Sequence, residues 1–169
     1  DVDFIIAATN PGPAFPAKTV GEAIEAIRGN PGKFNYASVG SGSPHHLFME
    51  ALKAELGLSI QHVPYKGTQA AIPDLLTGGV QMMFADATVA VPNIQAGKVT
   101  PLGTSSAKPT TLVPGVPPIA ATVKGFDWEA WQGIVAPAAT PPAIVAKLAA
   151  ELQRIQSTPE FREQLRKFG

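Results

Sequence analysis

The sequence has no cysteine, no net charge and no long apolar run, and each absence excludes a class of function. Without cysteine, disulfides, thiolate metal ligands and a cysteine nucleophile are excluded. A formal net charge of +0 lacks the basic excess that nucleic-acid binding normally requires, so no nucleic-acid partner is expected. A bilayer-spanning helix needs about 18 consecutive apolar residues, so we expect no direct membrane insertion.

What the sequence does contain is regular punctuation by 17 prolines and 16 glycines between apolar stretches. With 169 residues, 45% hydrophobic and 15% charged, the chain suits one globular domain. The periodicity predicts strands at 1–6, 34–39, 60–63, 80–86, 99–104 and 128–136, with helices at 20–28, 44–56, 70–77 and 89–96. This alternation favours an α/β fold with a largely parallel sheet flanked by helices.

The C-terminal third is expected to extend this fold. A Pro- and Ser/Thr-rich surface connection at 105–125 leads to the expected strand at 128–136. Thr140-Pro141 then starts a long helix, and a shorter one follows Thr158-Pro159. The long helix should turn four apolar side chains inward: Val145, Leu148, Leu152 and Ile155. Because the chain opens like a strand without an initiator Met, we expect it to be a piece of a longer protein.

A glycine- and serine-rich loop between a strand and a helix is the strongest candidate for a binding site. It runs from Ser38 to Pro44 and contains Gly40, Gly42 and three serines. Ligands of α/β folds bind where strands end and the next helices begin. Backbone donors at the helix start, together with the serine hydroxyls, suit a carboxylate. The same loop without a ligand would be a well-capped turn, and this alternative remains open.

Several other chemistries are not supported by the spacing of the residues. The loop lacks the third glycine of a dinucleotide fingerprint, and no Gly-x-Ser-x-Gly stretch marks a nucleophile elbow. Ser43, His46 and Asp86 do not form a natural triad, because a Ser and a His three apart at a helix start do not align. The adjacent His45 and His46 point in different directions on a helix, and His62 lies on a strand. We therefore expect no metal and no cofactor.

The order of short motifs along the chain resembles the Bug (TctC-type) receptors of tripartite tricarboxylate transporters. The resemblance covers essentially the whole chain, and the most recognisable segment is the hexapeptide 62–67. The family usually has Ser or Thr where this chain has Val39, Pro44 and His45. The matching segments read FNYAS, GSGS and HL at 34–47, HVPYKG at 62–67, DLL, GVQ and MFAD at 74–86, AGK at 96–98, TSSAK at 104–108, and W, G, APA and TPP at 131–142.

This resemblance implies one lobe of a two-lobed, periplasmic-binding-protein-like (Venus-flytrap) receptor, exported to the periplasm. Residues 1–169 would form the second lobe, with a hinge-related strand at 126–139 and C-terminal helices at 140–169, while the first lobe and the final C-terminal segment would be absent. The partners implied are a small carboxylate or related organic solute and a membrane permease. The residues expected to contact the ligand are Ser38, Gly40, Ser41, Gly42, Ser43, His46, Tyr65, Lys66, Gly67 and Asp86.

Roles for two of these residues have equally good alternatives. Lys66 could attract an anion or could be a solvated surface lysine, and Asp86 could hold an ammonium group or cap a helix. His46 is expected to hydrogen-bond to the glycine loop. No catalytic activity is expected, although a hydrolase-like enzyme on the same scaffold, or a sensor or protein-interaction module, remains an alternative.

Overall fold

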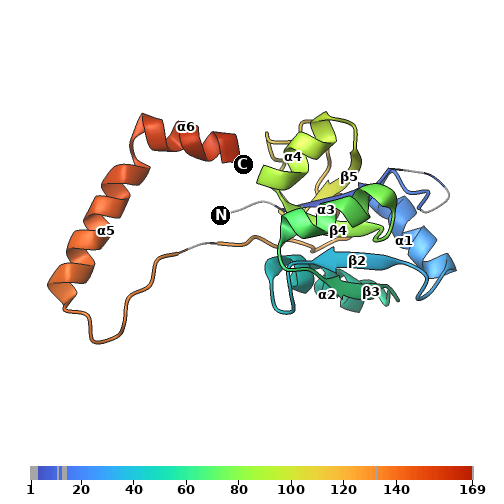
Figure 1. The fold of residues 1–169 in the computed structure, drawn as a ribbon, viewed down its shortest axis with the longest axis horizontal. Coiled ribbons are helices and arrows are strands. Elements are labelled where there is room, and N and C mark those ends of the chain that lie inside the picture. Colours follow the sequence, from blue (N-terminus) through green and yellow to red (C-terminus); the bar gives the residue numbers. More distant parts are fainter. Residues whose placement is uncertain (1–3, 11, 13–14, 132, 169) are drawn as a thin grey trace.

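The computed structural model describes residues 4–10, 12, 15–131 and 133–168, and its centre is a five-stranded sheet (Figure 1). The strand order is β3-β2-β4-β1-β5. The strands are β1 (Phe4–Thr9), β2 (Asn35–Ser38), β3 (Gln61–Pro64), β4 (Met82–Asp86) and β5 (Val99–Thr104). The expected α/β fold is confirmed, with a mixed sheet in which β2 runs parallel to β3 and β4, while β1 runs antiparallel to β4 and β5. Periodicity in the sequence reports burial and not strand direction, so it could not reveal the reversed β1.

Four helices cover the two faces of the sheet. They are α1 (Val20–Gly29), α2 (Pro44–Leu56), α3 (Thr68–Thr77) and α4 (Ala87–Gln95). The apolar sides of α1 and α2 pack in one core cluster, and those of α3 and α4 pack in another. All six residues of β1 are buried, because helices cover both of its faces.

Local sequence signals explain where these helices begin and end. A capping box starts α1: Thr19 Oγ1 accepts from Glu22 N at 3.2 Å, and Glu22 Oε2 accepts from Lys18 N at 2.7 Å. Pro44 occupies the first turn of α2, where its missing N–H costs nothing, and Gly57 ends that helix with a φ of 63°. Pro101 lies on β5 at the end of the sheet, where a residue without a backbone N–H is tolerated.

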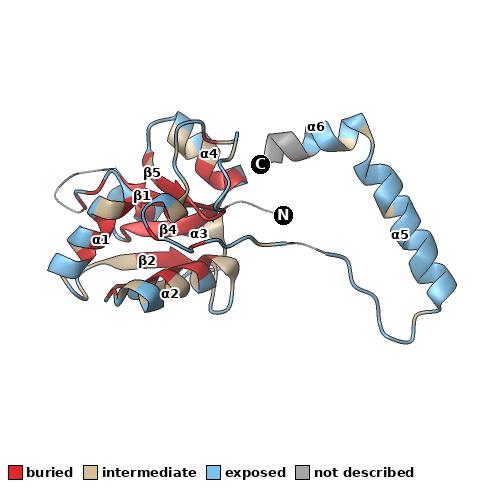
Figure 2. Ribbon diagram, turned by 180° about the vertical axis from the view of Figure 1, so that it is seen from behind, coloured by how far each residue is buried: buried red, intermediate tan, exposed pale blue. Residues whose placement is uncertain are grey.

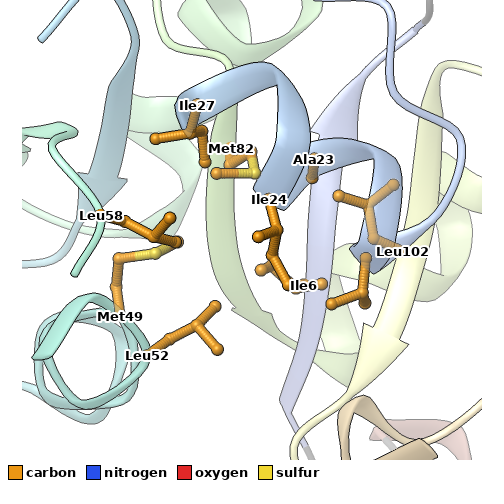
Figure 3. Close-up of a pocket in the computed structure, with 10 residues that line it drawn as sticks. Ile6, Ala23, Ile24, Ile27, Met49, Leu52, Leu58, Met82 and Leu102 are labelled. Carbon is orange, nitrogen blue, oxygen red and sulfur yellow. The ribbon is translucent and has the colours of Figure 1, made fainter. Parts of the chain in front are cut away.

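A small cavity lies inside the first core cluster, between the sheet, α1 and α2 (Figure 3). It leaves about 10 Å³ for the centre of a water-sized sphere, which is too little for an organic solute. It is lined only by apolar residues: Ile6, Val20, Ala23, Ile24, Ile27, Met49, Leu52, Leu58, Met82 and Leu102. This cavity therefore does not suit a polar or charged ligand.

The predicted strand at 128–136 is wrong for the residues that the structure describes. Only Ala130 makes an isolated bridge, and the rest of the segment, with Gln132 outside the described residues, has no regular structure. Ile134 and Val135 are exposed to 76% and 89%. Apolar residues form a strand only where a neighbouring strand pairs with them, and the described residues beyond the bridge at Ala130 pair with no strand.

The predicted inward face of the C-terminal helix is also not buried in this chain. Helix α5 (Pro142–Gln156) has no buried residue, and Figure 2 shows it standing apart from the sheet, with α6 (Pro159–Phe168) turning back toward α4. Val145, Leu148 and Ile155 are exposed to 43%, 54% and 40%. The helix forms as predicted, but the extended segment before it carries it away from the core.

The connection at 105–125 is partly buried rather than wholly at the surface. A short 3-10 turn, η1 (Ile119–Ala121), lies within it. Val113, Ile119 and Val123 are buried in the two core clusters. The connection therefore packs against the sheet and its helices and contributes to both core clusters.

Candidate functional site

The carboxyl ends of three parallel strands meet at one edge of the sheet. Strands β2, β3 and β4 end there at Ser38, Pro64 and Asp86. Because a helix follows each strand, the first turns of α2, α3 and α4 begin at the same edge (Figure 1). The predicted contact residues in 38–46, 65–67 and 86 lie in these strand-to-helix connections, which is where α/β folds place their ligands.

The loop before α2 has a backbone that only glycine adopts easily. Gly40 and Gly42 have φ values of 120° and 82°, and a Cβ at either would meet nothing within 4 Å. The glycines are therefore required by backbone conformation and not by crowding within the chain. Ser43 closes the loop, because its hydroxyl donates to Gly40 O at 2.7 Å and accepts from His46 N at 3.4 Å. Ser41 and Gly42 remain exposed at the tip of this turn.

Two imidazole rings support the ends of this loop. His46 Nδ1 accepts a hydrogen bond from Gly42 N at 3.3 Å, as expected from the sequence. Ser38 is fully buried, and its Oγ lies 2.5 Å from His62 Nε2 while it accepts from Gly40 N at 3.0 Å. The loop is thus fixed at both ends by side chains beneath it.

The segment 65–67, part of the hexapeptide 62–67, offers few side chains that could contact a ligand at this edge. The Tyr65 hydroxyl donates to Asp74 Oδ2 at 2.5 Å on α3, and burial together with Asp74 raises the pKa of Tyr65 to about 12. Lys66 is exposed, which suits a solvated lysine as well as an anion contact. Gly67 precedes α3, and no side chain caps the first turn of that helix.

Asp86 ties the starts of α3 and α4 together. It accepts hydrogen bonds from Thr68 Oγ1 at 3.2 Å and from the Thr88 hydroxyl, and His45 Nε2 lies 3.7 Å from its Oδ2. His45, then the hydroxyls of Thr88 and Thr68, lower the pKa of Asp86 to about 2, against the opposite effect of burial. A carboxylate fixed in this way is negative at neutral pH.

The arrangement favours binding by backbone donors over chemistry on the solute. No side chain caps the first turn of α3 or α4 through a hydrogen bond, so backbone amide donors remain at both helix starts, beside the negative Asp86 carboxylate. Ser43 does not contact His46 through its ring, and Asp86 contacts His45 instead, so the three residues considered as a triad are not aligned. Among the described residues, no group of three or more histidines and carboxylates is placed to hold a metal.

Three residues at this edge were not predicted from the sequence. His45, Thr68 and Thr88 surround Asp86, yet each stands in a motif that gave no sign of the contact. His45 was considered as a metal ligand and as a departure from the family pattern, but not as a partner of Asp86, and it is 7% exposed beside the Phe4 ring. His45 lies three, four and seven residues before the buried Phe48, Met49 and Leu52 of α2. This helical spacing could have predicted that its side chain is buried.

Comparison with known proteins identifies the family. A model of the tripartite tricarboxylate transporter family receptor (TctC) matches residues 7–169. The chain belongs to this family. It is 36% identical over 132 residues to a UPF0065 protein in the clcB-clcD intergenic region of Pseudomonas knackmussii, covering 77% of this chain and 78% of that protein. It is also 36% identical over 175 residues to a UPF0065 protein in the tcbD-tcbE intergenic region of Pseudomonas sp. strain P51, covering 99% and 52%.

Solved structures of TctC-like receptors share the fold of the whole chain. The periplasmic binding protein BugD superposes with a TM-score of 0.88 at 32% identity, over 99% of this chain and 55% of that one. MatC from Rhodopseudomonas palustris, solved with malate, gives 0.88 at 30%, over 99% and 56%. Rpa4515 of R. palustris, solved with adipate, gives 0.89 at 29%, over 99% and 56%. The chain therefore spans about half the length of most of the relatives it matches.

None of the helices among the described residues is both long and apolar enough to span a bilayer.

Proposed function

We propose that this chain is one lobe of a solute receptor that holds a small carboxylate at the edge formed by β2, β3 and β4. The observation that carries the proposal is that three helices, two of them without a side-chain cap, begin at the edge of the sheet that also holds the glycine loop at 40–43. Backbone amides at such positions bind carboxylate oxygens without reacting with them. Two family structures of the same fold are described with malate and adipate, which supports a carboxylate as the ligand class.

A second lobe completes the proposed site. The solved relatives superpose on 99% of this chain but are nearly twice as long, so much of each relative lies outside the matched part. Both β1 and the segment after β5 reach the edge where the ligand is expected, because Phe4 pairs with Asp86 and Trp128 N donates to Ser105 O. Chain crossings at this edge suit a hinge between two lobes that close on the solute.

In this proposal, the exposed apolar side of helix α5 packs against the other lobe. Its exposed apolar side and the extended segment before it form a groove of about 110 Å³ lined by Ile134, Val135, Ala136, Val145, Leu148, Ala149 and Leu152. Because the superpositions with the longer relatives include this helix, the additional half of a two-lobed receptor is the occupant that fits the groove. Residues 126–139 then serve as the crossing segment, and 140–169 pack across the lobe boundary.

The cellular role follows from the family. A receptor of a tripartite tricarboxylate transporter delivers its solute to a membrane permease, and the solved relative BugD is described as a periplasmic binding protein. We assign the same compartment and permease partner to the protein of which this lobe is a part. Transport then depends on closure of two lobes and not on catalysis.

Titration of the isotope-labelled chain with adipate and with malate tests the proposal. A single lobe offers half of a cleft, so we expect dissociation constants no tighter than about 1 mM, equivalent to about −4 kcal/mol. The amides of Gly40–Ser43 and those of the first turns of α3 and α4 should shift. Shifts elsewhere, with this edge unchanged, would contradict the proposed site.

A pair of matched substitutions makes the test specific. Gly42→Asp places a negative charge in the loop, and Gly97→Asp places the same charge after α4. Both glycines have positive φ and open space around a Cβ, so the two changes carry similar backbone strain. We expect binding to weaken at least tenfold in the first variant only, because like charges repel the solute at close range.

A further inference from the structure

The glycine loop is held by two histidine rings that lie against one another. The ring centroids of His46 on α2 and His62 on β3 are 4.4 Å apart, and Tyr36 of β2 stacks on His62 at 5.0 Å. His46 binds Gly42 and His62 contacts Ser38, so each ring reaches one end of the same loop. Two titratable groups therefore support the segment proposed to bind the solute.

The two hydrogen bonds respond differently to a proton. The Gly42 backbone N–H can only donate, so His46 Nδ1 must be the unprotonated nitrogen of a neutral ring. A proton added to Nδ1 turns it into a donor and removes the bond to Gly42. The Ser38 hydroxyl can donate or accept, so its contact with His62 Nε2 survives protonation of that ring with the direction reversed.

Charged and titratable side chains surround the two rings. Burial and then His46 lower the pKa of His62, while Glu50 opposes this effect and Lys53 adds to it. Burial would raise the pKa of Glu50, but hydrogen bonds from Lys53 and Tyr36 and the proximity of His46 lower it. The titratable groups facing the pair are thus Glu50 and Lys53 from α2 and Tyr36 from β2.

We propose that His46 is a pH-sensitive positioning residue: the loop 40–43 keeps its binding geometry only while the ring is neutral, and acidification releases Gly42 and weakens solute binding. The inference rests on the proposed function for its effect on binding, but not for the titration of the loop itself. The charge gained by His46 lies beside the Lys53–Glu50 pair and partly in water, so screening limits its attraction for an anionic solute.

The loop can be examined without any solute. We expect the hydrogen-exchange protection factor of the Gly42 amide to fall about fivefold between about pH 8 and pH 5, because one hydrogen bond of ordinary strength is lost. His46→Asn keeps an acceptor near the position of Nδ1 but cannot titrate, so its Gly42 amide should stay protected throughout. His46→Ala should be unprotected throughout. His62→Gln is the matched control, and its Gly42 amide should still respond to pH.

Affinity measured across the same pH range completes the test. With adipate or malate as the probe, the parent chain should bind about three- to tenfold more weakly at the acid end, and His46→Asn should lose this dependence. A Gly42 amide that does not respond to pH, or that responds equally in His46→Asn, overturns the inference, as does tighter binding in acid. If no solute binds at any pH, the proposed function fails, while the Gly42 titration still decides the role of His46.

Discussion

Replacing Asp86 with asparagine removes the charge that joins the starts of α3 and α4. The usual pKa of an aspartate is 3.8, and the contacts with His45, Thr88 and Thr68 lower that of Asp86 to about 2. This difference corresponds to at most about 2.5 kcal/mol of folding free energy. Because the side chain remains 25% exposed, solvent screening reduces our expectation to about 1–2 kcal/mol.

The sign of the pH dependence follows from the lowered pKa. The folded state holds the ionised form more tightly than the unfolded state does, so the stabilisation is fully present above the unfolded pKa of 3.8. It is lost as the pH falls from about 4 through the folded pKa of about 2. Asp86→Asn should therefore have a lower free energy of unfolding than the parent chain at neutral pH. The difference between the two free energies should become smaller in strong acid.

Urea denaturation of both chains from about pH 7 to about pH 2 measures this difference directly. Other carboxylates titrate in both chains, so the difference between the two curves isolates Asp86. Thr88→Val, which removes one hydroxyl donor and keeps the carboxylate, should lower stability by about 1 kcal/mol with a similar but smaller pH dependence. A constant difference between the parent chain and Asp86→Asn at every pH would refute the reasoning.

Three further changes test the packing and the capping of the lobe. A Cβ on Gly103 would lie 2.9 Å from Cγ1 of Ile119 and from Cγ2 of Val20, so Gly103→Ala should lower the unfolding free energy by about 1–3 kcal/mol in urea denaturation. Gly29→Ala, with open space around the new Cβ, should cost nothing, and equal effects of the two changes would contradict the packing. Ser43→Ala removes the cap of α2 and should lower the unfolding free energy by about 1 kcal/mol, and an unchanged midpoint would exclude that role. Leu148→Ser should change the stability of this chain by less than about 0.5 kcal/mol, since the side chain is 54% exposed, and a large loss would show that α5 is packed.

The strand-to-helix pattern of the lobe could be predicted because its signals are local. The capping box at Thr19 and Glu22 and the glycine that ends α2 act within a few residues of themselves. The glycine loop was likewise identified from its composition, because positive φ values at Gly40 and Gly42 restrict which residues can stand there. Its support by His46 followed from the spacing of three to four residues at the start of a helix.

The contacts that complete the edge could not be read from the chain. Asp86 meets Thr68 and His45 only because β4, α3 and α2 converge in space, across 18 and 41 positions of sequence. The strand expected at 128–136 failed for the same reason, since pairing depends on a neighbour that sequence does not specify.

The amino-acid sequence by itself determined the helices, the buried strands and the conformation of the glycine loop, because propensity, capping and periodicity act between neighbours in the chain. Only the tertiary structure decided the reversed direction of β1, the Asp86 cluster, the stacked histidines and the exposed position of α5. These features depend on contacts between segments that are far apart in the sequence. The free energy of such contacts comes from residues that no local sequence pattern connects.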